Sequence, residues 1–177
     1  MGTWNSRGLR GSTLEYMINL SIEKYRDSGI ALIQKIPTPI KPINIDKQNR
    51  HITLAYFEQK STVDYIGVVQ GIPVCFDAKE CSTDTFQMSN VHEHQIQFMK
   101  DFEEQNGIAF IILYYSHKDE IYYVPFNDIY DFYKRSKEGG RKSFRYDEID
   151  KNYRINNKSV VPVHFLECIN LDLSRRY

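Results

Sequence analysis

The sequence predicts a protein of the mixed α/β class. Three segments carry apolar residues at helical spacing, and the stretches between them are short apolar or alternating runs of strand length. With 177 residues and 41% hydrophobic content, a chain of this size can bury roughly 70% of the surface that its unfolded form would expose. These observations predict one domain over residues 1–177, ordered as helix, three strands with an inserted arm, helix, two strands and helix.

The first helix is predicted to begin after Ser12. Ser12 and Glu15 form the S-x-x-E pattern of a capping box. Gly29 ends the helix, because glycine readily adopts the left-handed conformation that follows a helix C-terminus. The run IALIQKI after it is typical of a strand. The apolar positions of the helix have helical spacing: Leu14, Met17, Ile18, Ile22 and Tyr25.

An arm is predicted between about residues 37 and 57. Pro37, Pro39 and Pro42 stand at its start, and proline belongs at sheet edges rather than in a central strand. Beyond them, isoleucines alternate with polar residues, a polar turn covers residues 47–50, and alternation then resumes. The pattern predicts a two-stranded arm that projects from the body of the protein.

The second half of the chain is predicted to alternate between helices and strands. A helix begins at Asn90, with Glu93 as its capping partner, and ends at Gly107. The run IAFIILYY is apolar enough for a strand covered on both faces, and IYYVP is a further strand. A short helix over residues 127–136 follows, and the turn-rich, basic tail from Gly139 is predicted to be irregular.

The stretch STVDYIGVVQGIPVCFDAKE predicts a hairpin that holds two aspartates, although strands are depleted in this residue. A two-residue turn at 70–71 places Asp64 directly opposite Asp77. The same register places Thr62 opposite Lys79. Residues two apart in a strand share a face, so these four side chains project from one face of the hairpin, at the end away from its turn. The other face is predicted to be core: Tyr65, Gly67, Val69, Ile72, Val74, Phe76 and Ala78.

The opposed aspartates indicate a metal site. Directly opposed side chains have Cβ atoms about 5 Å apart, so two carboxylates repel unless a proton or a cation lies between them. Hard oxygen ligands on a rigid sheet favour Mg²⁺ or Mn²⁺. Lys79 is expected to orient an attacking water or to offset charge on a phosphorane-like transition state. In the alternative interpretation, Asp64 caps a turn, and Asp77 and Lys79 form a surface ion pair worth about 0 to 1 kcal/mol.

Other polar residues near these motifs have simpler explanations. Gln95 lies on the second predicted helix and is expected to face solvent. Glu15 is accounted for as the partner in a capping box. His92 and His94 are two residues apart, which on a helix points them to different sides and argues against a shared metal.

The charge of the chain gives no general argument for a nucleic-acid or membrane partner, because 23 basic residues balance 23 acidic ones. Basic residues are instead gathered locally, and any one such cluster is more typical of a solvated surface. The clusters are Arg7 with Arg10; Lys35, Lys41, Lys47 and Arg50; Arg141, Lys142 and Arg145; and Arg175 with Arg176.

The cysteines and the N-terminal segment predict a soluble, cytoplasmic protein. Cys75, Cys81 and Cys168 are widely separated and form no C-x-x-C pair, so they indicate neither a disulfide framework nor a zinc site. The segment MGTWNSRGLRGSTLEYM contains no apolar stretch of signal-peptide or membrane-spanning length. We therefore expect a reducing compartment and no membrane partner.

Six motifs, in order, resemble those of RecU-type Holliday junction resolvases of Gram-positive bacteria and their phages: RGSTLEYMIN, IPTPI, STVDY, FDAKE, HEHQIQFMK and GGRKS. The resemblance extends over nearly the whole chain. It implies a restriction-endonuclease-like nuclease core, in which a mixed central sheet is flanked by helices. It also implies a homodimer that nicks four-way DNA junctions symmetrically with Mg²⁺ or Mn²⁺.

The resemblance also implies roles for individual residues. The metal-site positions of the family are matched by Thr62, Asp64, Asp77 and Gln95, and the position that stabilises the transition state is matched by Lys79. The arm corresponds to the family's stalk, which reaches into the centre of the junction. Two features depart from the family pattern. Asp77 stands where many relatives have glutamate, and the segment before SRGLRGSTLE lacks the longer basic extension of some relatives.

The sequence thus predicts a Mg²⁺-dependent DNA endonuclease with Asp64, Asp77 and Lys79 as catalytic residues. Two alternatives stay open: a nuclease of the same fold that acts on other branched or damaged DNA, and a junction-binding protein without catalytic activity. Contacts with four-way junction DNA are expected from Arg7, Arg10, Lys41, Lys47, Arg50, Arg141 and Lys142.

Overall fold

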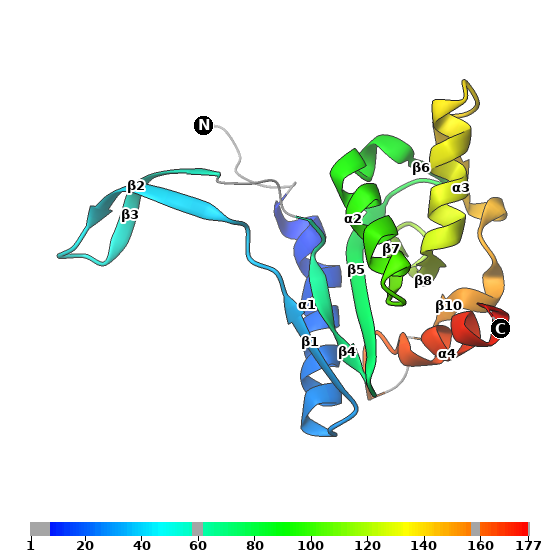
Figure 1. Cartoon of the computed structure of the whole chain (residues 1–177), viewed down its shortest axis with the longest axis horizontal. Helices are drawn as coiled ribbons and strands as arrows, with labels where there is room; N and C mark the ends of the chain where they lie inside the picture. Colours follow the sequence, from blue (N-terminus) through cyan, green and yellow to red (C-terminus); the bar gives the residue numbers. More distant parts are fainter. Residues whose placement is uncertain (1–7, 58–61, 157–159, 177) are drawn as a thin grey trace.

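The computed structural model describes residues 8–57, 62–156 and 160–176, and it places a six-stranded mixed sheet at the centre of the body (Figure 1). The strand order is β1-β4-β5-β7-β8-β10. Only the β5–β7 pair is parallel, and the other neighbours in this sheet are antiparallel. The strands are β1 (Ala31–Lys35), β4 (Tyr65–Val69), β5 (Ile72–Cys81), β7 (Ile108–Tyr115), β8 (Glu120–Pro125) and β10 (Arg154–Ile155).

Helices cover both faces of this sheet. On one face, α1 (Gly8–Asp27) and α4 (Leu166–Arg176) pack over a core that includes Ile18 and Ile169. On the other face, α2 (Glu93–Glu104) and α3 (Phe126–Lys137) pack over a second core that includes Met99 and Ile129. The prediction that IAFIILYY is covered on both faces is therefore confirmed, because seven of the eight residues of β7 are buried. The predicted α/β class is confirmed as well.

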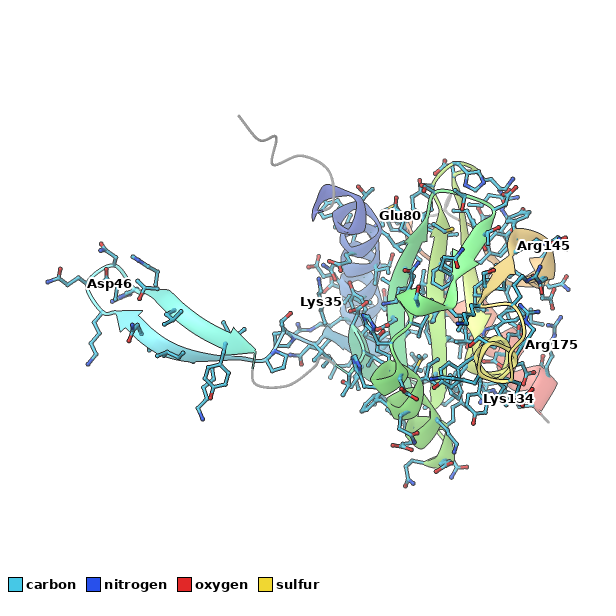
Figure 2. All side chains as sticks on the ribbon, turned by 90° about the horizontal axis from the view of Figure 1, so that it is seen from above. Lys35, Asp46, Glu80, Lys134, Arg145 and Arg175 are labelled. Carbon is cyan, nitrogen blue, oxygen red and sulfur yellow. The ribbon has the colours of Figure 1, made fainter. Side chains whose placement is uncertain are left out.

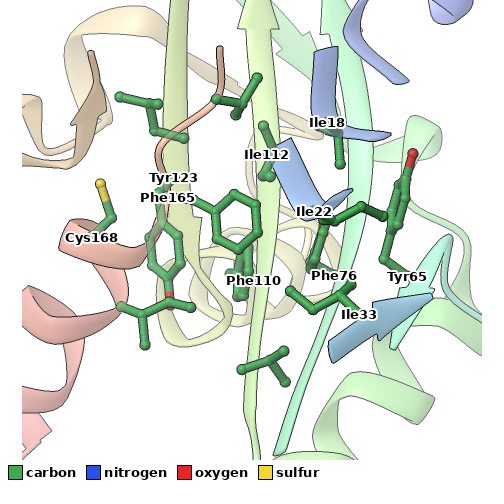
Figure 3. Close-up of a cluster of buried hydrophobic side chains, with 14 of the residues drawn as sticks. Ile18, Ile22, Ile33, Tyr65, Phe76, Phe110, Ile112, Tyr123, Phe165 and Cys168 are labelled. Carbon is green, nitrogen blue, oxygen red and sulfur yellow. The ribbon is translucent and has the colours of Figure 1, made fainter. Parts of the chain in front are cut away.

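A row of aromatic rings crosses four neighbouring strands within the first core (Figure 3). Successive ring centroids lie 4.7, 4.7 and 4.3 Å apart, and each stacked pair contributes about 0.5–1.5 kcal/mol beyond its burial. A one-residue slip of β4 against β5 would remove Tyr65 from this row and turn it to the other face of the sheet, so the row favours the observed register. The rings belong to Tyr65, Phe76, Phe110 and Tyr123.

The predicted arm is a separate two-stranded sheet of β2 (Ile40–Asp46) and β3 (His51–Phe57). It extends away from the body (Figure 1), and we call it the stalk. Its strands are joined by the turn predicted at residues 47–50, and the pairing shifts register on both sides of Asn44. The apolar side chains of the stalk are exposed: Ile40, Ile43, Ile45, Ile52, Leu54 and Tyr56.

Three predictions about helices were wrong. Helix α1 begins at Gly8, so Ser12 lies inside it and Glu15 is not a capping partner; S-x-x-E is a short pattern that a helix interior also accommodates. Helix α2 begins at Glu93, because a 3₁₀ turn occupies Met88–Asn90. The tail is not irregular, since it forms α4.

The tail contains further short elements besides α4. Strand β9 (Ser143–Arg145) pairs with β6 (Thr85–Gln87) in a second two-stranded sheet. Two 3₁₀ turns, Tyr146–Glu148 and Lys151–Tyr153, lead to β10. Among the helices that the structure describes, none combines the length and the apolar character needed to cross a membrane.

Candidate active site

The hairpin of β4 and β5 places the two aspartates as the sequence predicted. Gln70 and Gly71 both have positive φ, 47° and 89°, which is the geometry of a type I′ two-residue turn. Pairing then runs from Val69 opposite Ile72 to Tyr65 opposite Phe76. Asp64 and Asp77 are the next pair along, so their predicted opposition is confirmed. The predicted core face is also confirmed, since Tyr65 and Phe76 are fully buried.

Each aspartate is held by the backbone of the opposite strand. The amide of Asp64 donates to Oδ1 of Asp77 at 2.8 Å, and the amide of Ala78 donates to Oδ2 of Asp64 at 3.0 Å. Asp77 is completely buried, and Asp64 is half-buried. Hydrogen bonds from backbone amides stabilise carboxylates that otherwise repel each other, because the donors carry partial positive charge. The two carboxyl groups are therefore positioned before any ligand arrives.

The environment raises the pKa of Asp64 to about 6. Burial is the largest cause, and the negative charge of Asp77 adds to it. The amide of Ala78 and the ammonium of Lys79 act in the opposite direction, while Glu15 raises the pKa further. The charged form of Asp64 is thus disfavoured in the absence of a ligand. A cation bound nearby would stabilise this charged form and lower the pKa.

One oxygen of Asp77 lies beside an ammonium group but accepts no hydrogen bond. Nζ of Lys79 lies 3.0 Å from Oδ2 of Asp77, yet this buried oxygen accepts no hydrogen bond from the residues that the structure describes. The alternative of an ordinary surface ion pair is excluded, because Asp77 is fully buried and the side chain of Lys79 is only 18% exposed.

The donor set suits a hard divalent ion. Over the described ranges 8–57, 62–156 and 160–176, no group of three or more histidine, cysteine or acidic residues is arranged to hold a metal. Mg²⁺ needs no such group, because it is commonly bound through one or two carboxylates, several waters and substrate phosphate. Asp64 and Asp77 fit that mode of binding, since Oδ2 of Asp77 is charge-paired with Lys79 but accepts no hydrogen bond from the described residues.

Gln95 and Thr62, the other two predicted metal-site residues, lie in different surroundings. Gln95 is buried, so the expectation that it faces solvent was wrong. Its Oε1 accepts the amide of His92 at 3.1 Å, which caps the start of α2. Thr62 is half-buried and lies two residues before Asp64. The metal-binding roles of Gln95 and Thr62 stay predictions.

Sequence reasoning missed the surroundings of Glu15. Oε2 of Glu15 lies 2.5 Å from Nζ of Lys35, the last residue of β1, where the stalk leaves the body (Figure 2). The amide of Ile36, the next residue, donates to the backbone carbonyl of Asp64 at 2.8 Å. The missed signal was a lysine at the end of a predicted strand, two residues before the first proline of the arm.

The residues predicted to contact DNA lie in several places. Lys41, Lys47 and Arg50 are exposed on the stalk and form no ion pair within the described part of the chain. Arg7 lies outside the described residues, and Arg10 lies in α1, in a segment where the structure describes no side chains.

The remaining two candidates, Arg141 and Lys142, are neighbours with different surroundings. Arg141 forms an ion pair with Glu148 and donates to the carbonyl of Ser143 at 3.2 Å. Lys142 borders a cavity of about 640 Å³ together with His92 at the start of α2. Within the described residues, the ammonium of Lys142 has no ion-pair partner, whereas the guanidinium of Arg141 is paired with Glu148.

Comparison with known proteins identifies the family. The sequence model of the family described as "Recombination protein U" matches residues 9–171. A protein of Bacillus pumilus named Holliday junction resolvase RecU is 44% identical over 144 residues, covering 79% of this chain and 69% of its own length. A protein of the same name from a Geobacillus species is 40% identical over 148 residues, covering 81% and 74%.

A further relative and one solved structure also match the chain. The Holliday junction resolvase RecU of Staphylococcus aureus is 41% identical over 149 residues, covering 82% of this chain and 72% of its own. Among solved structures, the Holliday junction resolvase Hjc of Archaeoglobus fulgidus aligns over 67% of this chain and 75% of its own, with 7% identity and a TM-score of 0.42, too low a similarity to support an argument. The family match covers most of the chain, and the chain therefore belongs to the RecU, or Recombination protein U, family.

Proposed function

We propose that this protein is a metal-dependent endonuclease that resolves Holliday junctions by symmetric nicking of four-way DNA. The observation that carries the proposal is the pair of opposed, hydrogen-bonded carboxylates of Asp64 and Asp77 with Lys79 beside them. The family supports the substrate, because the relatives that match over most of the chain are named Holliday junction resolvases. The proposal includes Mg²⁺ or Mn²⁺ as cofactor.

In this proposal, Asp64 and Asp77 hold the metal ion through their carboxylate oxygens, and Thr62 and Gln95 supply further oxygen ligands. When bound, the ion polarises the scissile phosphate and lowers the pKa of a water molecule. The hydrogen bonds from the amides of Asp64 and Ala78 keep the two carboxylates in place. This positioning removes the need for the site to rearrange when the substrate binds.

Lys79 has the second chemical role. Its ammonium lies at the site, 3.0 Å from Oδ2 of Asp77, and is mostly buried. A cation in a partly desolvated position offsets negative charge that grows on a pentavalent phosphorus transition state, and it is also able to orient the attacking water. The products of such a reaction carry 5′-phosphate and 3′-hydroxyl ends.

We further propose that the chain is a single nuclease domain that acts as a homodimer in the cytoplasm. Two copies supply the two active sites that symmetric nicking of a four-way junction needs. The three cysteines are free and buried, which suits a reducing compartment. Junction phosphates are expected to contact Lys41, Lys47 and Arg50 on the stalk, Lys142 beside α2, and Arg7 and Arg10 near the N-terminus, with Arg141 as a weaker candidate because of its ion pair.

The deciding experiment is cleavage of a strand-labelled four-way junction with and without Mg²⁺, with linear duplex of the same sequence as the second substrate. We expect paired nicks on opposite strands of the junction, only with the metal. Similar cleavage of both substrates would favour a nuclease of broader specificity. Binding of the junction without any cleavage, in Mg²⁺ or in Mn²⁺, would favour a non-catalytic junction-binding protein.

A further inference from the structure

The base of the stalk is joined directly to the metal-site residue Asp64. Pairing between β1 and β4 extends one residue beyond Lys35 and Tyr65, because the amide of Ile36 donates to the carbonyl of Asp64 at 2.8 Å. Residue Asp64 therefore uses its amide to hold Asp77 and its carbonyl to hold the outgoing segment of the stalk. The backbone of a single residue links the stalk to the site.

A second contact fastens the same segment to α1. Nζ of Lys35 lies 2.5 Å from Oε2 of Glu15, and the two side chains are 43% and 34% exposed. Helix α1, which carries Glu15, packs against β1 and against β5, the strand that carries Asp77. The ion pair thus joins the end of β1 to α1. Its lysine, Lys35, directly precedes Ile36, whose amide is hydrogen-bonded to Asp64.

The backbone of the stalk base is conformationally restricted next to its hydrogen bond with Asp64. Pro37 follows Ile36 directly, and proline fixes its own φ and restricts the preceding residue to extended conformations. The returning strand β3 ends at Phe57, only a few residues before Thr62 and Asp64. The outgoing segment of the stalk therefore starts at a residue that is hydrogen-bonded to this aspartate.

We propose that Glu15 and Lys35 form a latch that keeps the stalk base hydrogen-bonded to Asp64, so that the position of the stalk on its DNA sets the position of a metal-binding carboxylate. This inference rests on the proposed nuclease function. Glu15 and Lys35 are positioning residues: they act through Ile36 and Asp64, and they touch neither the metal ion nor the scissile phosphate.

The latch predicts a specific kinetic pattern. Glu15→Gln should lower kcat for junction cleavage about tenfold, because small displacements of catalytic groups are costly in rate. Junction affinity should change less than about twofold, and the Mg²⁺ concentration for half-maximal binding should rise, measured by calorimetry on the DNA-free protein. The matched control is Glu104→Gln, which removes the exposed Lys100–Glu104 ion pair on α2 and should leave all three quantities unchanged.

A charge swap separates positioning from direct chemistry. Glu15→Lys combined with Lys35→Glu restores an ion pair of opposite polarity, and it should recover at least half of the lost kcat. Rescue of this kind is incompatible with Glu15 as a metal ligand or with Lys35 as a phosphate contact, because the swap destroys either role. A charge-swapped protein with the same low kcat as Glu15→Gln would overturn the latch. A kcat for Glu15→Gln within twofold of the wild type would also overturn it.

The latch is also measurable without cleavage, which separates it from the nuclease proposal. In the metal-free protein, hydrogen exchange of the Ile36 amide, followed by NMR, reports on its bond to Asp64. Exchange should speed up in Glu15→Gln, return towards the wild-type rate in the charge swap, and stay unchanged in Glu104→Gln. If wild-type protein showed the protected amide but cut no junction, only the proposed function would fail; if the amide exchanged equally in all variants, the latch would fail.

Discussion

The amide of Asp64 donates to the carboxylate of Asp77 at 2.8 Å, so one member of a repelling pair of acids helps to stabilise the other. The return bond runs from the amide of Ala78 to the carboxylate of Asp64. These bonds cross between β4 and β5, which the aromatic row holds in register. The pairing of β4 with β5 therefore sets the relative positions of the two carboxylates.

Asp64→Asn and Asp77→Asn should each abolish cleavage while junction binding stays within about threefold of the wild type. Loss of a metal-binding carboxylate removes transition-state stabilisation, whereas DNA affinity depends on phosphate contacts elsewhere. Cleavage would be measured on labelled four-way junctions, and affinity by fluorescence anisotropy in Ca²⁺. Wild-type rates in either variant would show that the opposed carboxylates are not the catalytic site.

The raised pKa of Asp64 predicts how stability depends on pH in the metal-free protein. In the folded state its pKa is about 6, against 3.8 for the unfolded chain, so the folded state binds this proton more tightly. The associated stability is present below pH 4 and is lost as the pH rises from about 4 to 6. As the pH rises through that window, the unfolding free energy of Asp64→Asn should therefore increase by about 3 kcal/mol relative to that of the wild type.

Urea unfolding at pH 4, 5, 6 and 7 would measure this difference. Addition of Mg²⁺ at pH 7 should stabilise the wild type and not Asp64→Asn, because an ion that binds only the folded state shifts the equilibrium towards it. A pH-independent difference between the two proteins would mean that Asp64 titrates normally in the folded state.

The two neighbours Arg141 and Lys142 should behave differently towards salt. Lys142→Ala is expected to lower the slope of log affinity against log salt by roughly one unit, because each phosphate contact releases about one counterion. Arg141→Ala removes an ion pair with Glu148 and should leave the slope unchanged. Its effect should instead be a melting temperature lower by about 1–3 °C. Equal slopes for the wild type and Lys142→Ala would show that Lys142 does not contact a DNA phosphate.

The hairpin could be predicted from the sequence because its geometry is fixed locally. A two-residue turn leaves one possible register, and the register alone places Asp64 opposite Asp77. The stalk was predictable for a similar reason, since prolines and half-polar alternation exclude a central strand. In both cases the determining interactions lie within about twenty residues of each other.

Glu15 and Gln95 were misinterpreted because their partners are distant in sequence or their pattern is ambiguous. S-x-x-E fits a capping box and a helix interior equally, and only the contact with Lys35 distinguishes the two. Gln95 was expected in solvent because glutamine is usually exposed, although it lies four residues before Met99 on the buried face of α2. Helix α4 was missed because the turn-rich, basic character of the tail near Gly139 was extended to the end of the chain, although Leu166, Ile169 and Leu173 recur at helical spacing.

The stalk gives the prediction that best separates a junction resolvase from a general nuclease. Its strands form their own two-stranded sheet, and their apolar side chains are roughly half exposed, so the body does not depend on them for its core. Replacement of residues 43–54 by a short Gly-Ser turn should therefore leave the melting temperature within about 3 °C of the wild type, because exposed substitutions contribute little to stability.

The shortened protein should stay dimeric by light scattering but lose its preference for four-way junctions over linear duplex. The reason is that Lys47 and Arg50 at the turn would no longer reach phosphates that converge at the centre of a junction, where recognition depends on the shape of the DNA. Lys47→Ala with Arg50→Ala is the matched control, since it keeps the stalk and removes only charge, and it should weaken junction binding with part of the preference retained. A monomeric product would instead assign the exposed apolar face of the stalk to dimerisation, and a dimer with full junction preference would show that the stalk does not recognise the junction.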